Sequence, residues 1–219
     1  SRLMASVARA MMIQRPFSRF VRNPTRGISR MRAIVVDSIM RRPKPDALKI
    51  ANYDTPEVRP NDVLIKVSTA GVNRPDIYQR LGLYPPPPGH SKIMGLEVSG
   101  TVVEKGSNVP ESTVVGRQVL ALTNGGGYAE YCAVPYTQCL PVPRNMDMIT
   151  AGCVAETFFT VWHNLFQQTN IFGDKLSKGD RVLIHRGSSG IGMTAIQIAR
   201  AMGVTVYTTA GINALGAAE

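Results

Sequence analysis

A glycine-rich turn is the feature of this sequence with the most recognisable chemistry. The segment Gly187-Ser188-Ser189-Gly190-Ile191-Gly192 follows the apolar run Val182-Leu183-Ile184 and precedes a helical pattern over Met193–Met202. Glycines at such a position let backbone N–H groups approach a pyrophosphate, and the helix N-terminus adds a partial positive charge. The spacing G-x-x-G-x-G is less specific than G-x-G-x-x-G, so its place between a strand and a helix carries the prediction of a dinucleotide site. The alternative is a glycine-rich connector that binds nothing.

The end of the next predicted strand indicates which dinucleotide would bind. Val204–Thr208 reads as a strand, and the residues that follow, Thr209-Ala210-Gly211, include no acid. Sites for NAD commonly place Asp or Glu there to bind the ribose hydroxyls, so its absence favours NADP, in the reduced form NADPH. No Arg or Lys follows to pair with a 2′-phosphate, so this preference is an inference from an absence. Thr209 is included among the candidate cofactor-binding residues.

These features belong to a βαβ unit. The strands Arg181–His185 and Val204–Thr208 flank the helix, and such a unit is parallel and right-handed. A further helical pattern over Ala155–Gln168 precedes it. A doubly wound sheet has about six strands, whereas residues 153–219 supply two, so we expect an incomplete sheet with an exposed edge and exposed apolar faces.

The region before the βαβ unit consists mainly of short predicted strands. The predicted strands are Ala33–Val36, Val63–Val67, Val98–Val103, Gln118–Leu122 and Tyr128–Val134. One short helix interrupts them, with Asn73 as its N-cap, Pro75 in its first turn and Gly82 after its end. The run Pro85–Pro88 predicts an extended surface loop, because proline fits neither a helix interior nor a sheet interior.

Four segments together resemble the zinc-free quinone oxidoreductase branch of the medium-chain dehydrogenase/reductase superfamily. They are Gly71–Pro85, Gly125–Tyr131, Ala155–Trp162 and Ser188–Ala199. The resemblance runs from Met31 to about Gly211. It implies an α/β protein with a β-rich part: a GroES-like β-barrel catalytic domain at 31–152 and a Rossmann domain from residue 153 that is C-terminally incomplete. It also implies NADPH between the two domains, and reduction of quinones or related enones.

The resemblance assigns roles to individual residues. It implies that Asn73, Tyr78 and Tyr84 line the catalytic site and that Asn73 and Thr160 contact the cofactor. The alternatives are that Asn73 is only an N-cap, that the two tyrosines pack on the proline loop, and that Thr160 is an ordinary helix residue. Arg186 stands where this branch usually has glycine, and it would either pair with the pyrophosphate or crowd it.

The zinc-dependent branch of the superfamily has metal ligands that this sequence lacks. Where that branch has Cys and Gly-His-Glu, the sequence reads Val72-Asn73 and Gly95-Leu96-Glu97. The three cysteines are also too few for a four-cysteine structural site. We therefore predict no metal site. Without a Lewis acid, the reaction suits an acceptor such as a quinone or an enone, whose conjugated system spreads the developing charge.

The net charge of +10 is concentrated at the N-terminus. Residues 1–30 hold seven arginines, no lysine and no acid. This Arg-rich, Ser-containing segment is typical of a mitochondrial presequence, and a basic tail without a target is the alternative. Downstream of this segment, aromatic residues do not alternate with Lys and Arg as they would in a single-strand binding surface, so we predict no nucleic-acid binding. No apolar run approaches the roughly 20 residues of a transmembrane segment.

Three functions remain open on the sequence alone. The first is a mitochondrial NADPH-dependent quinone or enone reductase in the matrix or on the matrix side of the inner membrane, either as a homodimer or as a subunit of a larger mitochondrial assembly. The second is a non-catalytic accessory subunit of a mitochondrial complex, built on a truncated reductase fold. The third is an enoyl-thioester reductase. In the family, a Leu-Gly-Ala run such as Leu215–Ala217 follows the second strand only after most of another helix. Whether the chain is catalytically active therefore stays open at this point.

Overall fold

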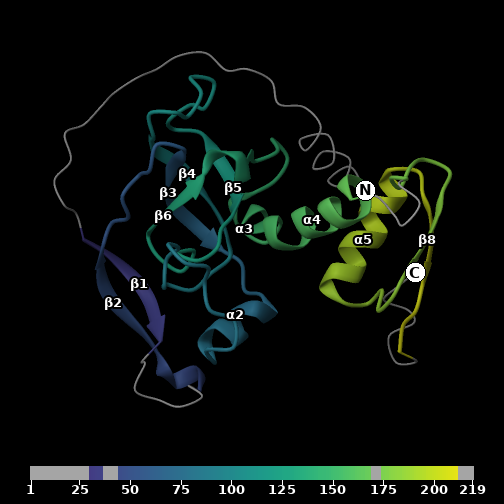
Figure 1. The fold of residues 1–219 in the computed structure, drawn as a ribbon, viewed down its shortest axis with the longest axis horizontal. Coiled ribbons are helices and arrows are strands. Elements are labelled where there is room, and N and C mark those ends of the chain that lie inside the picture. The colour runs from purple at the N-terminus through teal and green to yellow at the C-terminus, as the bar shows by residue number, and fades with distance from the viewer. Residues whose placement is uncertain (1–29, 37–43, 169–173, 212–219) are drawn as a thin grey trace. The chain divides into compact units, whose positions relative to one another are not determined.

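The computed structural model describes residues 30–36, 44–168 and 174–211. The presequence-like segment before Arg30 and the run Leu215–Ala217 lie outside these residues. Within them, contacts divide the chain into a β-rich unit that ends at Val154 and an α/β unit that begins at Ala155 (Figure 1). Among the described residues, no helix has the length and apolar character that a membrane span requires.

The β-rich unit is built on a five-stranded antiparallel sheet. In the order β6-β3-β4-β5-β7, its strands are Tyr131–Pro135, Asp62–Ala70, Glu97–Lys105, Gln118–Leu122 and Cys139–Pro141. A separate antiparallel pair joins β1 (Arg30–Val36) to β2 (Leu48–Asp54). Short helical segments complete the unit: η1 (Pro45–Ala47), α2 (Arg74–Arg80), η2 (Tyr136–Gln138) and α3 (Met148–Ala151).

Apolar side chains from four strands form the core of this unit. The fully buried members include Val63, Ile65, Val98, Val102 and Val134. Residues two apart on a strand point to the same face, so Val63 and Ile65 enter the core together. The core fixes the sheet that carries α2 and the loops around it.

The predicted short helix is confirmed as α2. It begins at Arg74 after the N-cap Asn73 and ends at Arg80, and Gly82 follows with a φ of +72°. Glycine adopts this left-handed conformation without the Cβ clash that other residues incur, which explains why the chain turns there. The run Pro85–Pro88 lies outside helices and strands, as predicted.

Three strands of the β-rich unit differ from the prediction. β7 was not predicted, because a strand of only three residues gives no recognisable pattern. β2 was not predicted, because six of its seven residues are exposed or polar and give no alternation signal. The strand predicted from Tyr128 begins only at Tyr131. Ala129 makes an isolated bridge to Ala33, and the Tyr128 side chain bonds elsewhere in the unit.

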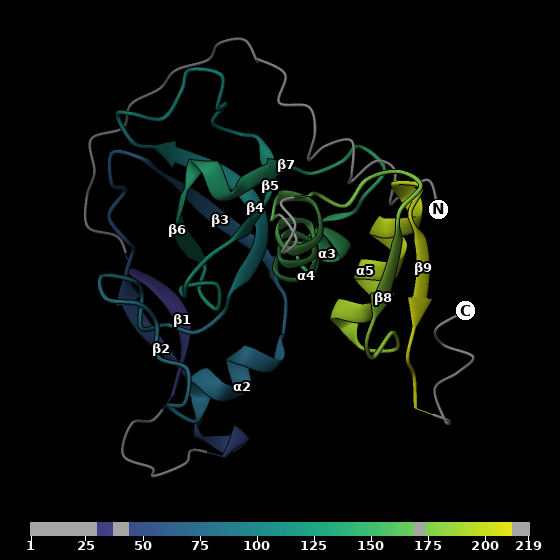
Figure 2. The same cartoon turned by 45° about the vertical axis from the view of Figure 1, so that its right-hand side comes forward.

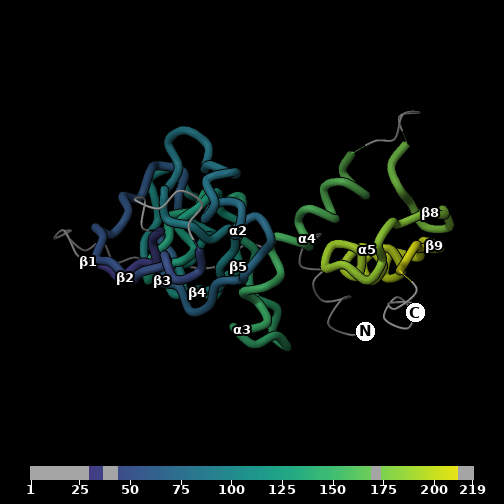
Figure 3. Tube along the Cα trace, turned by 90° about the horizontal axis from the view of Figure 1, so that it is seen from below, coloured from purple at the N-terminus to yellow at the C-terminus, as the bar shows by residue number. Residues whose placement is uncertain are grey.

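The α/β unit contains a parallel strand pair. β8 (Arg181–Ile184) and β9 (Thr205–Thr208) pair in parallel, and α5 (Gly190–Ala201) connects them, which confirms the predicted βαβ unit (Figure 2). Helix α4 (Ala155–Trp162) contacts α5. In the tube view, β8 and β9 run beside α5 (Figure 3).

Two details of this unit refine the prediction. The helix predicted over Ala155–Gln168 is α-helical to Trp162 and continues as a π-helix, η3, over His163–Gln167. Leu183 and Tyr207 are partners in the strand register, and each is more than half exposed. One apolar face of the strand pair is therefore open, as expected.

Candidate functional site

The glycine-rich turn of the α/β unit is shaped by close contacts on one side only. A Cβ on Gly187 would collide with the Thr208 hydroxyl, and a Cβ on Gly192 would collide with the Arg186 carbonyl oxygen. A Cβ on Gly190 would meet nothing within 4 Å. Two glycines thus let the turn pack on itself, while the third faces open space. A backbone cradle of this kind admits a phosphate group next to main-chain N–H groups.

The first turn of α5 supplies those N–H groups. Ser189 is the N-cap, and its hydroxyl oxygen accepts a hydrogen bond from the Gly192 N–H at 3.0 Å. The N–H groups of a helix's first turn have no partner inside the helix, which leaves those of Gly190 and Ile191 to a ligand. The partial positive charge of the helix terminus favours an anion there.

Thr209 ties the end of β9 to this turn. Its hydroxyl oxygen accepts from the Arg186 N–H at 3.1 Å, and its carbonyl oxygen accepts from the Gly187 N–H at 2.9 Å. This candidate cofactor-binding residue therefore also holds the glycine turn in place. Half-buried Ser188 lies within the same turn.

Thr160 forms an ordinary intrahelical contact in α4. Its hydroxyl donates to the Glu156 carbonyl oxygen at 2.6 Å. This contact agrees with the alternative that Thr160 is an ordinary helix residue. A role of Thr160 in cofactor binding stays a prediction.

In the β-rich unit, Asn73 lies at the centre of a hydrogen-bonded cluster. Its Nδ2 donates to Glu97 Oε1 at 2.7 Å, and its backbone N–H donates to Asp76 Oδ2 at 2.7 Å. Gly71 makes room for this arrangement, because a Cβ there would overlap the Glu97 carboxylate. Asn73 thus occupies the N-cap position while its side-chain amide is oriented by a residue on β4.

Asp76 and Tyr128 extend this hydrogen-bonded cluster. Asp76 is 4% exposed, and its Oδ2 accepts from the Tyr128 hydroxyl at 2.9 Å. Burial raises the pKa of Asp76, and the N–H of Asn73 and the phenol of Tyr128 act against that rise. Burial, followed by the adjacent Asp76, raises the pKa of Tyr128 as well, so its hydroxyl stays a donor. Sequence reasoning missed this pair, since 52 residues separate its members.

The two candidate tyrosines lie on the surface of the unit. Tyr78 is 43% exposed and Tyr84 is 50% exposed. The Tyr84 N–H donates to the Tyr78 carbonyl oxygen at 3.2 Å, which holds the two residues close in space. Within the described residues, neither hydroxyl makes a hydrogen bond, so both phenols are available to a ligand.

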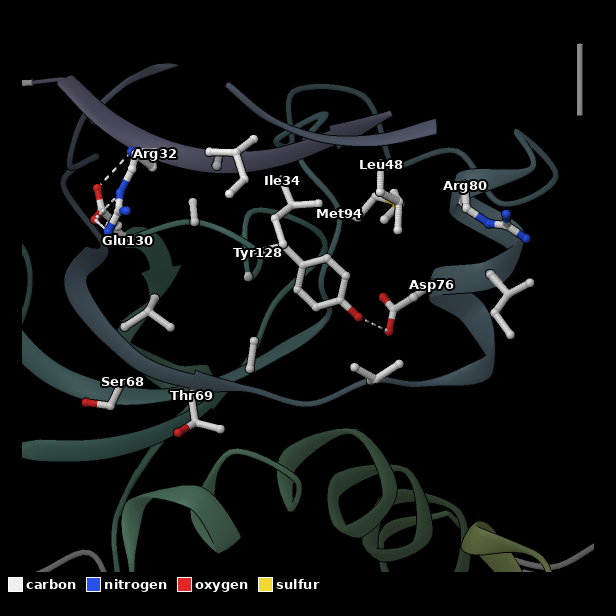
Figure 4. Close-up of a pocket in the computed structure, with 18 residues that line it drawn as sticks. Arg32, Ile34, Leu48, Ser68, Thr69, Asp76, Arg80, Met94, Tyr128 and Glu130 are labelled. Carbon is white, nitrogen blue, oxygen red and sulfur yellow. Dashed lines mark hydrogen bonds and ion pairs between the residues drawn. The ribbon is translucent and has the colours of Figure 1, made fainter. Parts of the chain in front are cut away.

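A cavity of about 680 Å³ lies beside the Asp76–Tyr128 pair (Figure 4). Its wall is mostly apolar and includes Ile34 and Met94, and the ion pair of Arg32 with Glu130 (2.7 Å) lies at one edge. Asn73, Tyr78 and Tyr84 are not among the lining residues. The structure therefore does not bring the predicted catalytic residues to this cavity, and no sequence signal indicated it.

Metal-binding side chains do not cluster within the described part of the chain. No group of three or more His, Cys, Asp or Glu residues there is arranged to hold a metal ion. Cys153 is exposed, and burial and the nearby Glu97 raise the pKa of its thiol. The prediction that this chain uses no metal stays a prediction.

Comparison with known proteins identifies the family. Residues 59–144 match the alcohol dehydrogenase GroES-like domain. Human quinone oxidoreductase is 31% identical over 168 residues, which cover 76% of this chain and 50% of that protein. The structure of the quinone oxidoreductase from Coxiella burnetii superposes with a TM-score of 0.67 at 28% identity, over 87% of this chain and 59% of that chain. The chain belongs to the medium-chain dehydrogenase/reductase superfamily.

Membership in this superfamily confirms the predicted family and fold. A GroES-like β-rich unit precedes a partial Rossmann-like sheet. A subunit of the phenolphthiocerol/phthiocerol polyketide synthase of Mycobacterium tuberculosis is likewise 31% identical, over 77% of this chain and 7% of that protein. The chain spans about half the length of human quinone oxidoreductase. These relatives support an oxidoreductase, and quinone oxidoreductases of the superfamily generally use NAD(P)H.

Proposed function

We propose that this chain is an NADPH-dependent reductase of quinones or similar enones. The observation that carries the proposal is the glycine turn at the start of α5, where Gly190 faces open space and first-turn N–H groups are available for a pyrophosphate. When bound, NADPH supplies the hydride. The absence of an acid after β9 favours the 2′-phosphorylated nucleotide.

The residues of the β-rich unit would position the acceptor. The amide of Asn73 is held by Glu97 and is therefore oriented before any ligand arrives. The exposed phenols of Tyr78 and Tyr84 are hydrogen-bond donors suited to an oxygen that gains negative charge. Because a quinone or enone spreads that charge over its conjugated system, we propose that the reaction proceeds without zinc, with Asn73 in the place of a cysteine ligand.

NADPH oxidation by the purified chain tests this proposal. We expect the absorbance at 340 nm to fall when 1,4-naphthoquinone is added. Asn73→Ala should lower kcat by about 10²-fold, the effect of losing one preorganised polar group. Tyr84→Phe should also lower kcat, whereas Tyr53→Phe, an exposed tyrosine on β2, serves as the matched control. Absence of turnover by folded wild-type protein would refute the proposal.

Two other functions predict different results in the same preparation. The match to a polyketide synthase subunit favours an enoyl-thioester reductase as the second candidate, and that function predicts faster NADPH oxidation with crotonyl-CoA than with the quinone. A non-catalytic subunit predicts no turnover with either acceptor, together with co-purification in a large mitochondrial complex. An active homodimer would exclude the latter.

We also propose that the chain is directed to mitochondria. The seven arginines and the absence of acids in residues 1–30 support this location. A fusion of residues 1–30 to a fluorescent protein should enter mitochondria. The same fusion with its arginines replaced by glutamine should remain outside, and entry of both fusions alike would contradict the targeting role.

A further inference from the structure

Arg186 adopts a backbone conformation that its residue type disfavours. Its φ is 59°, and it is the single non-glycine residue with a positive φ in the described part of the chain. A side chain at such a position crowds the backbone, and glycine would adopt the same φ without that cost. Residues in this conformation are held there by the surrounding structure and cluster at active and ligand-binding sites, so Arg186 is a candidate for a functional role.

The backbone of Arg186 lies at a junction of three elements of the nucleotide fold: β8, the residue after β9, and the N-terminus of α5. It follows the end of β8, and its N–H donates to the hydroxyl of Thr209, just after β9, at 3.1 Å. Its carbonyl oxygen accepts from the N–H of Ser189, the N-cap of α5, at 2.9 Å. Parallel sheets bind dinucleotides at the carboxyl ends of their strands and read the ribose next to the end of the second strand. Arg186 therefore lies at the ribose end of the predicted site.

The charges around this junction favour a phosphate. No acid occurs in the segment Thr208–Gly211, where a carboxylate would bind the ribose hydroxyls of NAD. Arg186 is exposed and makes no ion pair with the described residues. His185 shares the Thr209 hydroxyl through Nδ1 at 3.2 Å, so the remaining ring nitrogen is a second polar group beside the junction. A guanidinium presents several donors in a plane that matches phosphate oxygens.

We propose that Arg186 is the specificity-determining residue of this site and that its guanidinium pairs with the 2′-phosphate of NADPH. The inference rests on the proposed nucleotide site and deepens it. The pyrophosphate already has the backbone N–H groups of the glycine turn and the N-terminus of α5. Arg186 thus supplies the cation that is missing after β9, from the loop that follows β8 instead.

Binding of two nucleotides without nicotinamide tests the inference. The full 219-residue chain is titrated calorimetrically with 2′,5′-ADP and with 5′-AMP, which differ by the 2′-phosphate. Arg186→Gly should raise the Kd of 2′,5′-ADP by about tenfold or more, as expected for loss of a charge-assisted bidentate pair. The same variant should change the Kd of 5′-AMP by less than about twofold. Arg186→Lys should restore part of the loss, because it restores the charge without the planar fork.

Two measurements separate this role from a folding defect. Arg186→Gly should melt at the wild-type temperature or above it, because glycine suits a φ of 59°. Arg181→Ala, at the opposite end of β8, is the matched control and should bind both nucleotides as the wild type does.

The possible results decide between the inference and the function on which it rests. Equal weakening of 2′,5′-ADP and 5′-AMP would place the guanidinium at a phosphate common to both and would overturn the inference. Unchanged binding of 2′,5′-ADP by Arg186→Gly would also overturn it, while leaving the nucleotide site intact. Failure of the folded wild-type chain to bind either nucleotide or NADPH would overturn the proposed function, and the inference with it.

Discussion

Removal of the Tyr128 hydroxyl is the most direct test of the cluster that holds Asn73. Tyr128→Phe keeps the ring and deletes the donor that lies 2.9 Å from Asp76 Oδ2. Asp76 is 4% exposed, and its Oδ1 makes no hydrogen bond within the described residues. The buried carboxylate would therefore lose its side-chain donor and keep the Asn73 N–H.

The expected loss in the free energy of unfolding follows from the charge of the Asp76 carboxylate, which accepts the hydrogen bond. Hydrogen bonds to charged groups contribute about 1.5–3 kcal/mol, so Tyr128→Phe should lower the free energy of unfolding by about 2 kcal/mol at pH 7. This corresponds to roughly a 30-fold change in the folding equilibrium. Urea denaturation at pH 7 measures it, with Tyr131→Phe as the control, because the Tyr131 hydroxyl has no hydrogen bond in the described part of the chain.

The loss of stability caused by Tyr128→Phe should also depend on pH, in a direction set by the pKa of Asp76. Burial raises the pKa of Asp76 in the folded state above its unfolded value near 3.9. The folded state then holds its proton more tightly, so this group favours folding below the unfolded pKa, and that contribution is lost as the pH rises through the folded pKa. A neutral carboxyl group needs the phenol less than a carboxylate does.

The cost of Tyr128→Phe should therefore shrink as the pH falls through the raised pKa of Asp76. Urea titrations at a series of pH values from 7 down to about 4 follow this change. A cost at pH 7 below about 0.5 kcal/mol, or one that grows toward acid pH, would refute the reasoning that the hydroxyl stabilises a charged, buried Asp76.

Three further predictions concern the glycine turn and the cysteines. Ser189→Ala removes the N-cap of α5 and should cost about 1 kcal/mol in urea denaturation. Gly192→Ala forces a Cβ onto the Arg186 carbonyl oxygen and should lower the melting temperature. Gly190→Ala should leave the melting temperature unchanged but weaken 2′,5′-ADP binding in calorimetry. Equal melting temperatures of the two variants would contradict the assigned contacts. Burial raises the pKa of Cys132 to about 12, so iodoacetamide should label exposed Cys153 first and Cys132 only after unfolding, as mass spectrometry would reveal.

The sequence predicted the parts of the fold that local patterns encode. The limits of α2 follow from Asn73, Pro75 and Gly82, and the parallel strand pair follows from a glycine turn between an apolar run and a helix. β2 escaped prediction because its residues are mostly exposed and show no period. Its pairing with β1 is a tertiary contact, and tertiary contacts override weak local preference.

Contacts between distant residues explain why the candidate site was only partly predicted. Asn73 was recognised as an N-cap, but its amide bonds to Glu97, which is 24 residues away. A pattern of neighbouring residues contains no information about such a partner. The same holds for Arg186, whose left-handed φ appears only in the folded turn.

The hydrogen bonds from Tyr128 through Asp76 and Asn73 to Glu97 lie entirely within the β-rich unit. Each member restricts the next: the phenol and the Asn73 N–H share Asp76 Oδ2, and the amide of Asn73 is then directed at Glu97. Polar groups that are fixed before a ligand binds need not reorganise when charge develops. Asn73 is therefore oriented by its own unit, so the loss of Tyr128 should disturb its amide even though the phenol is not itself proposed to contact the substrate.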